Sequence, residues 1–182
     1  MSKRAVVVVD LQNEYLPTGK LPLVGIDQAL GNAARVISAA RSKGDLVVHV
    51  RHEFVQPDTP FFVPGTDGVR IHQSVTPLEG EQVIVKNSPN SFLNTNLKQA
   101  LDAQGTDEVT IIGAMSHMCV DATTRAASDF GYKTTVVDDA CATRDLEFRG
   151  EVVPAAYVQA AMMSALGFAY AKVVTTEEYI AM

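Results

Sequence analysis

The sequence predicts an α/β fold with a mostly parallel sheet, and three observations lead to that prediction. Short apolar segments of strand type alternate with helical segments along the chain, which is the pattern of strands joined by crossover helices. Residues 109–140 contain a buried strand, a tight turn, a helix and a second buried strand in direct succession. The chain has 182 residues and no linker or repeat, so we expect one domain, residues 1–182.

The first third of the chain predicts a strand, a helix and a second strand. The run AVVVVD ends in Asp10 and is followed by a Pro/Gly-containing loop. Apolar side chains then recur at helical spacing over residues 26–43, and a glycine after the basic end is a helix stop. Residues 46–50 form the next strand. The segment 53–80 is one long excursion, and such loops inside a compact domain are usually lids or interfaces.

The rest of the chain continues the alternation. The expected elements, in order, are a strand at 83–86, a helix at 94–104, a strand at 109–114, a helix that opens near Cys119, a strand at 133–139, a helix at 154–166 ended by Gly167, and a short strand at 172–175.

Three chemically active side chains stand at the predicted carboxyl ends of strands. Asp10 ends the first strand, Lys86 ends another, and Cys119 lies where a strand passes into a helix. Ligands of open α/β sheets bind at this edge. A thiol at a helix N-terminus is biased toward the thiolate, because free N–H groups and the helix dipole favour negative charge. If the strands are neighbours, Asp10 can take the thiol proton, Lys86 can hold the anionic groups, and the thiolate can attack a carbonyl-type carbon.

Each of these residues also has an ordinary structural interpretation. A cysteine after a strand is more often a small buried hydrophobic side chain than a nucleophile, and aspartate or lysine at a strand end is common. The coincidence of all three at three strand ends favours a catalytic site. Cys141 has no charged activator nearby in sequence beyond Arg144, and we interpret it as structural.

The segments around the three residues resemble the isochorismatase-like cysteine hydrolases, a family related to nicotinamidases and N-carbamoyl amidohydrolases. The resemblance rests on VVVVDLQNEY around Asp10, VIVKNSPNSF around Lys86 and IIGAMSHMCVDATTRAA around Cys119. The segments have the family's order and spacing, the match extends over essentially the whole chain, and the third segment is the most specific.

That resemblance implies a three-layer α/β/α fold, doubly wound around a mostly parallel six-stranded sheet. It implies a catalytic triad in which Cys119 is the nucleophile, Asp10 the general base and later acid, and Lys86 the electrostatic support. Members typically have a cis peptide bond shortly before the cysteine, which falls here between Ala114 and Met115. By the same resemblance, the backbone N–H groups of Met115 and Cys119 form the oxyanion hole.

Three histidines, His49, His52 and His72, lie in and after the second strand. Nicotinamidases of the resembled family carry an Asp-x-His metal motif in this region, where the present chain has His52-Glu53-Phe54. Phenylalanine cannot ligate a metal, and residues three apart on a strand point to opposite faces. We therefore predict no metal and no other cofactor, with a metal-assisted nicotinamidase-type amidase as the alternative.

Substrate-pocket candidates come from both ends of the expected site. Gln12 and Tyr15 follow the first strand and are expected to face the same crevice as Asp10. His117, two residues before Cys119, either lines the pocket or bonds a neighbouring backbone group.

Further candidates lie on or before the long excursion. Phe54 and Phe62, together with Phe61, either cover a planar substrate or pack the loop onto the core or a partner subunit. Arg51 can pair with a substrate carboxylate, although a surface salt bridge is its commoner role.

Composition argues against several classes of protein. The net charge of −6 and the absence of a Lys/Arg run argue against nucleic-acid binding. No apolar stretch reaches the roughly 20 residues of a membrane-spanning helix, and the N-terminus enters a strand without a signal peptide. Two cysteines do not make a disulfide framework. We expect a cytoplasmic protein with a small-molecule substrate and no nucleic-acid or membrane partner.

A thiolate beside a carboxylate suits acyl transfer. We predict a hydrolase of non-peptide C–N bonds that cleaves an amide, carbamoyl or lactam bond of a small molecule through an acyl-enzyme on Cys119. Vinyl-ether hydrolysis, the isochorismatase reaction itself, needs no thiol, so the cysteine argues against it. The alternative of another class is a thiol redox sensor or non-catalytic binding protein on the same fold. Asp10 and Lys86 favour catalysis, because a sensor needs only the activated thiol.

Two segments predict assembly into a homodimer or homotetramer. The 53–80 excursion is rich in Phe, Val and Pro, and the helix near 155–166 presents small residues and two methionines. Exposed apolar surface of this kind marks interfaces, and members of the resembled family are commonly dimers or tetramers. We expect the interface to use one or both segments.

Overall fold

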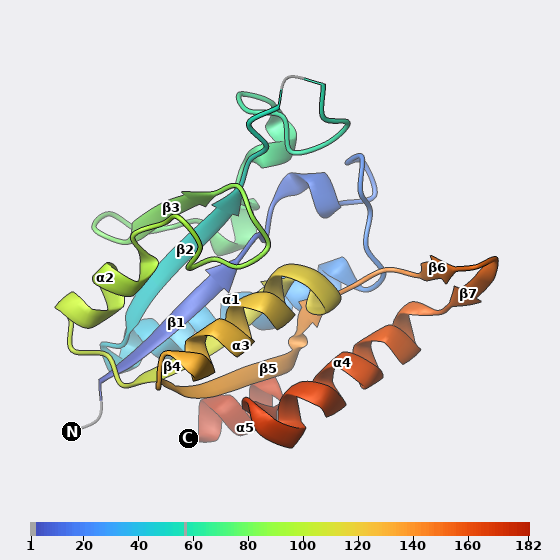
Figure 1. The fold of residues 1–182 in the computed structure, drawn as a ribbon. Helices are drawn as coiled ribbons and strands as arrows, with labels where there is room; N and C mark the ends of the chain where they lie inside the picture. Colours follow the sequence, from blue (N-terminus) through green and yellow to red (C-terminus); the bar gives the residue numbers. More distant parts are fainter. Residues whose placement is uncertain (1–2, 57) are drawn as a thin grey trace.

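The fold is built on one six-stranded parallel sheet with helices on both faces (Figure 1). The computed structural model describes residues 3–56 and 58–182. The strand order is β3-β2-β1-β4-β5-β8, and all neighbouring strands are parallel. These strands are β1 (Arg4–Val9), β2 (Leu46–His52), β3 (Gln82–Lys86), β4 (Glu108–Ala114), β5 (Lys133–Ala142) and β8 (Lys172–Val174). The predicted α/β/α class and the six-stranded, doubly wound sheet are confirmed.

Helices cover the sheet in two layers. One core joins α1 and α5 to the first face of the sheet, and a second core joins α2, α3 and α4 to the other face. The helices are α1 (Ile26–Lys43), α2 (Leu97–Ala103), α3 (Asp121–Asp129), α4 (Ala155–Ala169) and α5 (Thr176–Ala181). None of the helices in the described residues is both long and apolar enough to cross a membrane.

The central strand β1 shows why this sequence forms a sheet that is buried on both faces. Val6 and Val8 pack in the core beneath α1, whereas Val7 and Val9 pack in the core on the opposite face. Side chains alternate between faces along a strand, so a continuous valine run supplies apolar contacts to both layers. Burying each valine contributes about 1.5–3 kcal/mol relative to leaving it exposed.

The helix α1 follows the predicted bounds. Its inward side chains, including Leu30, Ala33 and Ile37, are buried. Gly44 ends the helix in the left-handed conformation (φ 73°), and its N–H donates to the carbonyl groups of Ala40 and Arg41. Glycine adopts this backbone conformation without steric cost.

Several boundaries differ from the sequence-based prediction. The helix α4 continues through Gly167 to Ala169, so this glycine lies inside the helix, on a side that faces Val173, instead of ending it. The strand β5 extends to Ala142, past the predicted end at residue 139.

Three elements were not predicted from the sequence. They are the antiparallel hairpin of β6 (Leu146–Phe148) and β7 (Glu151–Val153), and the helix α5. In Figure 1 the hairpin projects beyond the body of the sheet between β5 and α4.

The excursion between β2 and β3 has little regular structure. It contains two single-turn 3-10 helices, η2 (Asp67–Val69) and η3 (Gln73–Val75). Figure 1 shows it standing beyond the carboxyl end of β2, at the edge where the chemically active residues were predicted.

Candidate active site

Asp10 lies at the carboxyl end of β1 and is completely buried. Its backbone is left-handed, with φ 52°, and its N–H donates to the carbonyl oxygen of Val50 at 3.0 Å. The neighbouring strand β4 approaches closely at Gly113, where a Cβ atom would lie 2.0 Å from the carbonyl oxygen of Val9. Only glycine fits there, so β1 and β4 run side by side up to the site.

Lys86 connects the other two predicted residues, Asp10 and Cys119, although its strand is not beside the strand that precedes Cys119. Two strands, β2 and β1, separate β3 from β4, and the long lysine side chain spans this distance. Its Nζ lies 2.7 Å from Asp10 Oδ2 and 3.3 Å from Cys119 Sγ, and it donates to the carbonyl oxygen of Ser88 at 3.0 Å. The lysine is only 1% exposed, so the ammonium group is held entirely by protein groups.

Cys119 lies in the turn that joins β4 to α3. The turn begins with the cis peptide bond between Ala114 and Met115, at the position that the resemblance implied. A π-helical turn, η4 (Ser116–Val120), follows and passes directly into α3. The thiol is therefore in the first helical turn, as predicted, and the cysteine is 6% exposed.

The electrostatics of Cys119 differ from the sequence-based expectation. Burial and the negative charge of Asp10 raise the pKa of the thiol well above its usual value, and Lys86 offsets them only in part. The predicted bias toward the thiolate is therefore wrong for the resting site. Burial outweighs the favourable helix position, because charge is costly away from water.

The pKa values of the other two members are also raised. Burial raises the pKa of Asp10 against the opposing effect of Lys86. Burial alone would lower the pKa of Lys86, but the charges of Asp10 and Cys119 outweigh it and raise the pKa. Asp10 and Cys119 together therefore keep one proton, so that one negative charge at most lies beside the Lys86 ammonium. Ionising both would place two negative charges beside a single positive charge.

His52 is a fourth member of this cluster, and sequence reasoning missed its contact with Lys86. Its Nδ1 lies 2.9 Å from Lys86 Nζ, and the two residues are register partners on β2 and β3. Burial and the charge of Lys86 lower the pKa of His52 to about 4. The neutral ring thus accepts a hydrogen bond from the ammonium. The sequence feature that could have identified His52 is its position at the end of β2, at the same edge of the sheet as Asp10.

A metal ion does not fit this cluster. Among the described residues, Asp10, His52 and Cys119 form the one group of three or more potential ligands whose donor atoms lie within 4.8 Å of one another. The Lys86 ammonium lies among these donors, at 2.7, 2.9 and 3.3 Å. A metal ion there would meet a positive charge that the same three groups already bind.

The other two histidines considered as metal ligands lie elsewhere. His49 bonds to Glu81 at 3.1 Å, and His72 bonds to Ser74 in the excursion. Neither joins the cluster around Lys86.

A cavity of about 470 Å³ opens onto Cys119, a size typical of small-molecule sites. Its walls are mainly apolar and aromatic, with a few polar side chains. The apolar lining residues are Tyr15, Leu21, Phe54, Phe61, Phe62, Pro89, Met115, Met118 and Leu146, and the polar ones are His52, Asn87, His117 and Arg144.

Five predicted pocket residues line this cavity, namely Tyr15, Phe54, Phe61, Phe62 and His117. The rings of Phe54 and Phe62 pack around His52, with centroids 4.7 and 5.3 Å from its ring. These phenylalanines therefore both line the cavity and pack the excursion onto the core. His117 bonds to a neighbouring side chain, Thr143, at 2.6 Å.

Gln12 does not face the cavity, which corrects the sequence-based expectation. Its Nε2 donates to the carbonyl oxygens of His52 and Val69, both at 2.9 Å. Its Oε1 accepts from the N–H of His52 at 2.8 Å. The amide is 1% exposed, does not line the cavity, and joins β2 to the excursion through both of its N–H groups and its oxygen. Arg51 likewise pairs with Glu53 at 2.6 Å.

Comparison with known proteins agrees with this architecture. The model of the isochorismatase domain matches residues 4–178. The chain belongs to the isochorismatase family. Within this family it is 48% identical to the protein YddQ of Bacillus subtilis (strain 168) over 176 residues, which is 97% of this chain and 98% of YddQ. It is also 30% identical to the maleamate amidohydrolase of Pseudomonas putida over 78% of this chain and 73% of that enzyme.

Solved structures show the same relationship for this isochorismatase-family hydrolase. A family member from Oleispira antarctica has a TM-score of 0.96 and 50% identity, covering 100% of this chain and 97% of that one. N-carbamoylsarcosine amidase from Thermoplasma acidophilum has a TM-score of 0.82 and 30% identity, covering 96% and 97%. Relatives of this chain thus include amidohydrolases that act on C–N bonds.

Proposed function

We propose that the protein hydrolyses an amide, carbamoyl or lactam C–N bond of a small molecule through a covalent acyl-enzyme on Cys119. The observation that carries this proposal is the buried Lys86 ammonium, which lies 2.7 Å from Asp10 and 3.3 Å from Cys119, the member of the three that lines the cavity. Relatives that act on maleamate and N-carbamoylsarcosine support the type of bond.

Acylation begins with transfer of the thiol proton to Asp10. Burial raises the pKa of Asp10, which makes this carboxylate a stronger base for the thiol proton than an ordinary carboxylate. The new thiolate lies beside the Lys86 ammonium. Its electron pair then attacks the carbonyl carbon of the substrate.

The tetrahedral intermediate places negative charge on the former carbonyl oxygen. We assign its stabilisation to the backbone N–H groups of Met115 and Cys119, because such donors act strongly where water is excluded. As the intermediate collapses, the C–N bond breaks and protonated Asp10 gives its proton to the leaving nitrogen. Cys119 is left as a thioester and Asp10 as a carboxylate.

Deacylation repeats the sequence with water as the nucleophile. Asp10 takes a proton from the water, whose oxygen attacks the thioester carbon. Collapse releases the acid, and the thiolate regains the proton from Asp10. Lys86 stays an ammonium throughout, since its pKa is raised, and it balances whichever neighbour carries the negative charge.

The cavity favours a substrate with an apolar or planar acyl group. Phe54, Phe61 and Phe62 supply aromatic walls. Arg144 also lines the cavity, donates to the carbonyl oxygen of Asp145 at 3.3 Å, and makes no ion pair with a carboxylate of the described residues. An exposed guanidinium there favours a substrate that carries a carboxylate over one that carries an ammonium group.

The proposal is tested with a panel of small amides, ureas and lactams, assayed for release of ammonia or amine. Cys119→Ala and Cys119→Ser should lower kcat/KM by several orders of magnitude while the circular dichroism spectrum stays unchanged. A Cys119→Ala variant within tenfold of the wild type on any substrate would reject the covalent mechanism.

Two further arms address the alternatives. Activity should survive exhaustive treatment with EDTA or dipicolinate, because Lys86 occupies the position a cation would need. Loss on chelation and recovery with zinc, iron or manganese would favour a metal-assisted amidase. Rapid peroxide oxidation of Cys119 in a protein without turnover would favour a redox sensor. The buried thiol with a raised pKa argues against the sensor.

A further inference from the structure

The turn that carries Met115 and Cys119 is anchored from behind by one serine. Ser116 is the first residue of η4 and is 0% exposed. Its Oγ lies 2.5 Å from Gln159 Oε1 and 3.1 Å from the carbonyl oxygen of Ala142. This anchor is separate from the triad, because none of its bonds involves Asp10 or Lys86.

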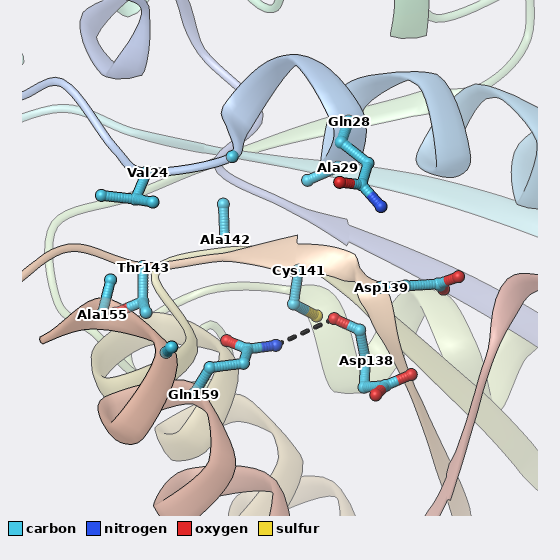
Figure 2. Close-up of a pocket in the computed structure, with 12 residues that line it drawn as sticks. Val24, Gln28, Ala29, Asp138, Asp139, Cys141, Ala142, Thr143, Ala155 and Gln159 are labelled. Atoms are coloured by element: carbon cyan, nitrogen blue, oxygen red, sulfur yellow. Dashed lines mark hydrogen bonds between the residues drawn. The ribbon is translucent and has the colours of Figure 1, made fainter.

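Gln159, on α4, connects this serine to β5. Its Nε2 donates to the backbone carbonyl of Asp138 at 2.9 Å, as the dashed line in Figure 2 shows. A carbonyl oxygen can only accept, so this bond fixes the orientation of the amide and turns Oε1 toward Ser116. The serine hydroxyl is therefore the donor to Gln159.

The strand that Gln159 holds is irregular at this point. Between Ile111 and Gly113 the partner residue on β5 moves from Val136 to Cys141, so an advance of two residues on β4 corresponds to five on β5. Asp138 lies in the extra length, where regular pairing with β4 is interrupted. Pairing resumes at Gly113 and Ala114, which face Cys141 and Ala142, so Gln159 and Ser116 join the interrupted stretch of β5 to the turn that follows β4.

Packing alone does not hold the Gln159 side chain. It borders a cavity of about 270 Å³ between α1, β5 and α4, which is distinct from the cavity at Cys119. Figure 2 shows Gln159 on the α4 side of this space and Gln28 on the α1 side. The two hydrogen bonds of Gln159 therefore determine where its amide lies.

We infer that Gln159 is a positioning residue for the proposed reaction: acting through Ser116, it fixes the turn whose backbone N–H groups receive the developing oxyanion. This inference rests on the proposed function. Displacement of such donors by a fraction of an ångström weakens transition-state binding more than substrate binding. Gln159 does not line the cavity at Cys119 and bonds to no member of the triad, so its removal should lower kcat and leave KM nearly unchanged.

The test compares Gln159→Met, Ser116→Ala and the double variant with Gln28→Met as the matched control. Methionine keeps the length of glutamine without its hydrogen bonds, and the adjoining cavity gives it room. Rates are measured on the best amide of the panel and divided by the content of titratable Cys119, so misfolded protein does not contribute. Hydrogen exchange of peptides covering residues 113–121 is measured in parallel.

We expect kcat of Gln159→Met to fall about 10- to 100-fold, with KM within about twofold, and exchange over residues 113–121 to accelerate. Ser116→Ala should show the same fall in kcat and the same faster exchange as Gln159→Met. The kcat of the double variant should be no lower than that of either single variant, and Gln28→Met should have the kcat and exchange of the wild type. Ser116→Thr, which keeps the hydroxyl, should retain most of the activity.

Two results would overturn the inference. One is unchanged kcat together with unchanged exchange in Gln159→Met, and the other is additive losses in the double variant. If the wild type hydrolyses no compound, the proposed function fails. In that case the exchange comparison alone decides whether Gln159 positions the turn.

Discussion

Asp10 has two opposing effects on Cys119. As a base it must accept the thiol proton, and as a nearby negative charge it raises the pKa of the thiol. Replacing it with asparagine removes both effects. The ammonium of Lys86, no longer neutralised at 2.7 Å, would then stabilise the thiolate.

We predict that Asp10→Asn lowers amide hydrolysis at least 10³-fold and accelerates alkylation of Cys119 by iodoacetamide at pH 7. Both rates are measured on the same preparation, with Asp121→Asn as the control outside the cavity. Parallel loss of hydrolysis and alkylation would contradict the account, because it would mean that Asp10 activates the thiol in the resting site.

His52 gives a prediction about stability and pH. Its pKa is about 4 in the folded protein and 6.5 ordinarily, so between these values the unfolded chain binds a proton that the folded protein does not. The free energy of unfolding should therefore decrease as the pH falls from 6.5 to 4, by at most roughly 3 kcal/mol from this residue.

Urea unfolding at several pH values measures this dependence. In His52→Gln, which keeps an acceptor for Lys86, the slope between pH 6.5 and 4 should be shallower. His72→Gln, in the excursion, should keep the slope of the wild type. Equal slopes in wild type and His52→Gln would show that burial and the charge of Lys86 do not keep this histidine neutral in the folded protein.

At the residue scale the sequence predicted Asp10, Lys86 and Cys119, because each stands at a strand end and in a recognisable segment. It did not predict the role of Gln12, whose amide binds backbone groups brought close only by the fold. It also mispredicted the charge state of Cys119. The helix position is visible in the sequence, whereas the burial that outweighs it is not.

At the scale of elements, the excursion between β2 and β3 is held over the cavity by buried side chains of the first loop. Glu14 is 3% exposed, and its carboxylate accepts from the N–H of Phe62 at 2.8 Å and of Lys20 at 2.9 Å. It thus fixes a phenylalanine of the cavity wall to the chain after β1.

Glu14→Gln keeps the shape but turns an amide N–H toward one of these donors. We predict a loss of about 1–3 kcal/mol in the free energy of unfolding and a several-fold higher KM, because Phe62 moves, with a smaller change in kcat. Denaturation and steady-state kinetics measure these quantities, with the exposed Glu79→Gln of the same excursion as control. An unchanged KM would show that this contact of the excursion does not contribute to substrate binding.

Regular elements were predictable where local pattern and tertiary packing agree. The valine run of β1 and the spacing of α1 are examples. The prediction ended α4 at Gly167, but a glycine inside a helix is tolerated when a neighbour packs on it, as Val173 does. The β6–β7 hairpin was missed because its strands have three residues each, too few to show a period.

At the scale of the whole molecule, α4 presents an apolar surface that contains no charged residue. Tyr157 is 70% exposed and Phe168 is 93% exposed. On the adjoining hairpin, Phe148 and Val152 are 68% and 62% exposed. Large apolar side chains exposed along a helix and on the hairpin before it are typical of an interaction surface, and we propose that a second copy of the chain covers it.

Light scattering should report a multiple of the 19.6 kDa chain. Phe168→Glu should shift the population toward the monomer at micromolar concentration, since a charge would be buried at the interface. Leu93→Glu, which introduces the same charge at an exposed leucine before α2, should leave the oligomeric state unchanged. A fully active wild-type monomer would reject both the assembly and any contribution of a second copy to the pocket.

Intact-protein mass spectrometry after rapid acid quench would detect an acyl group carried by Cys119 during turnover. During the first turnover of the best amide, we expect a species heavier by the acyl group, located on the peptide that contains Cys119 and absent from Cys119→Ser. Completion of that turnover with Cys119 unmodified at every quench time would reject the covalent mechanism.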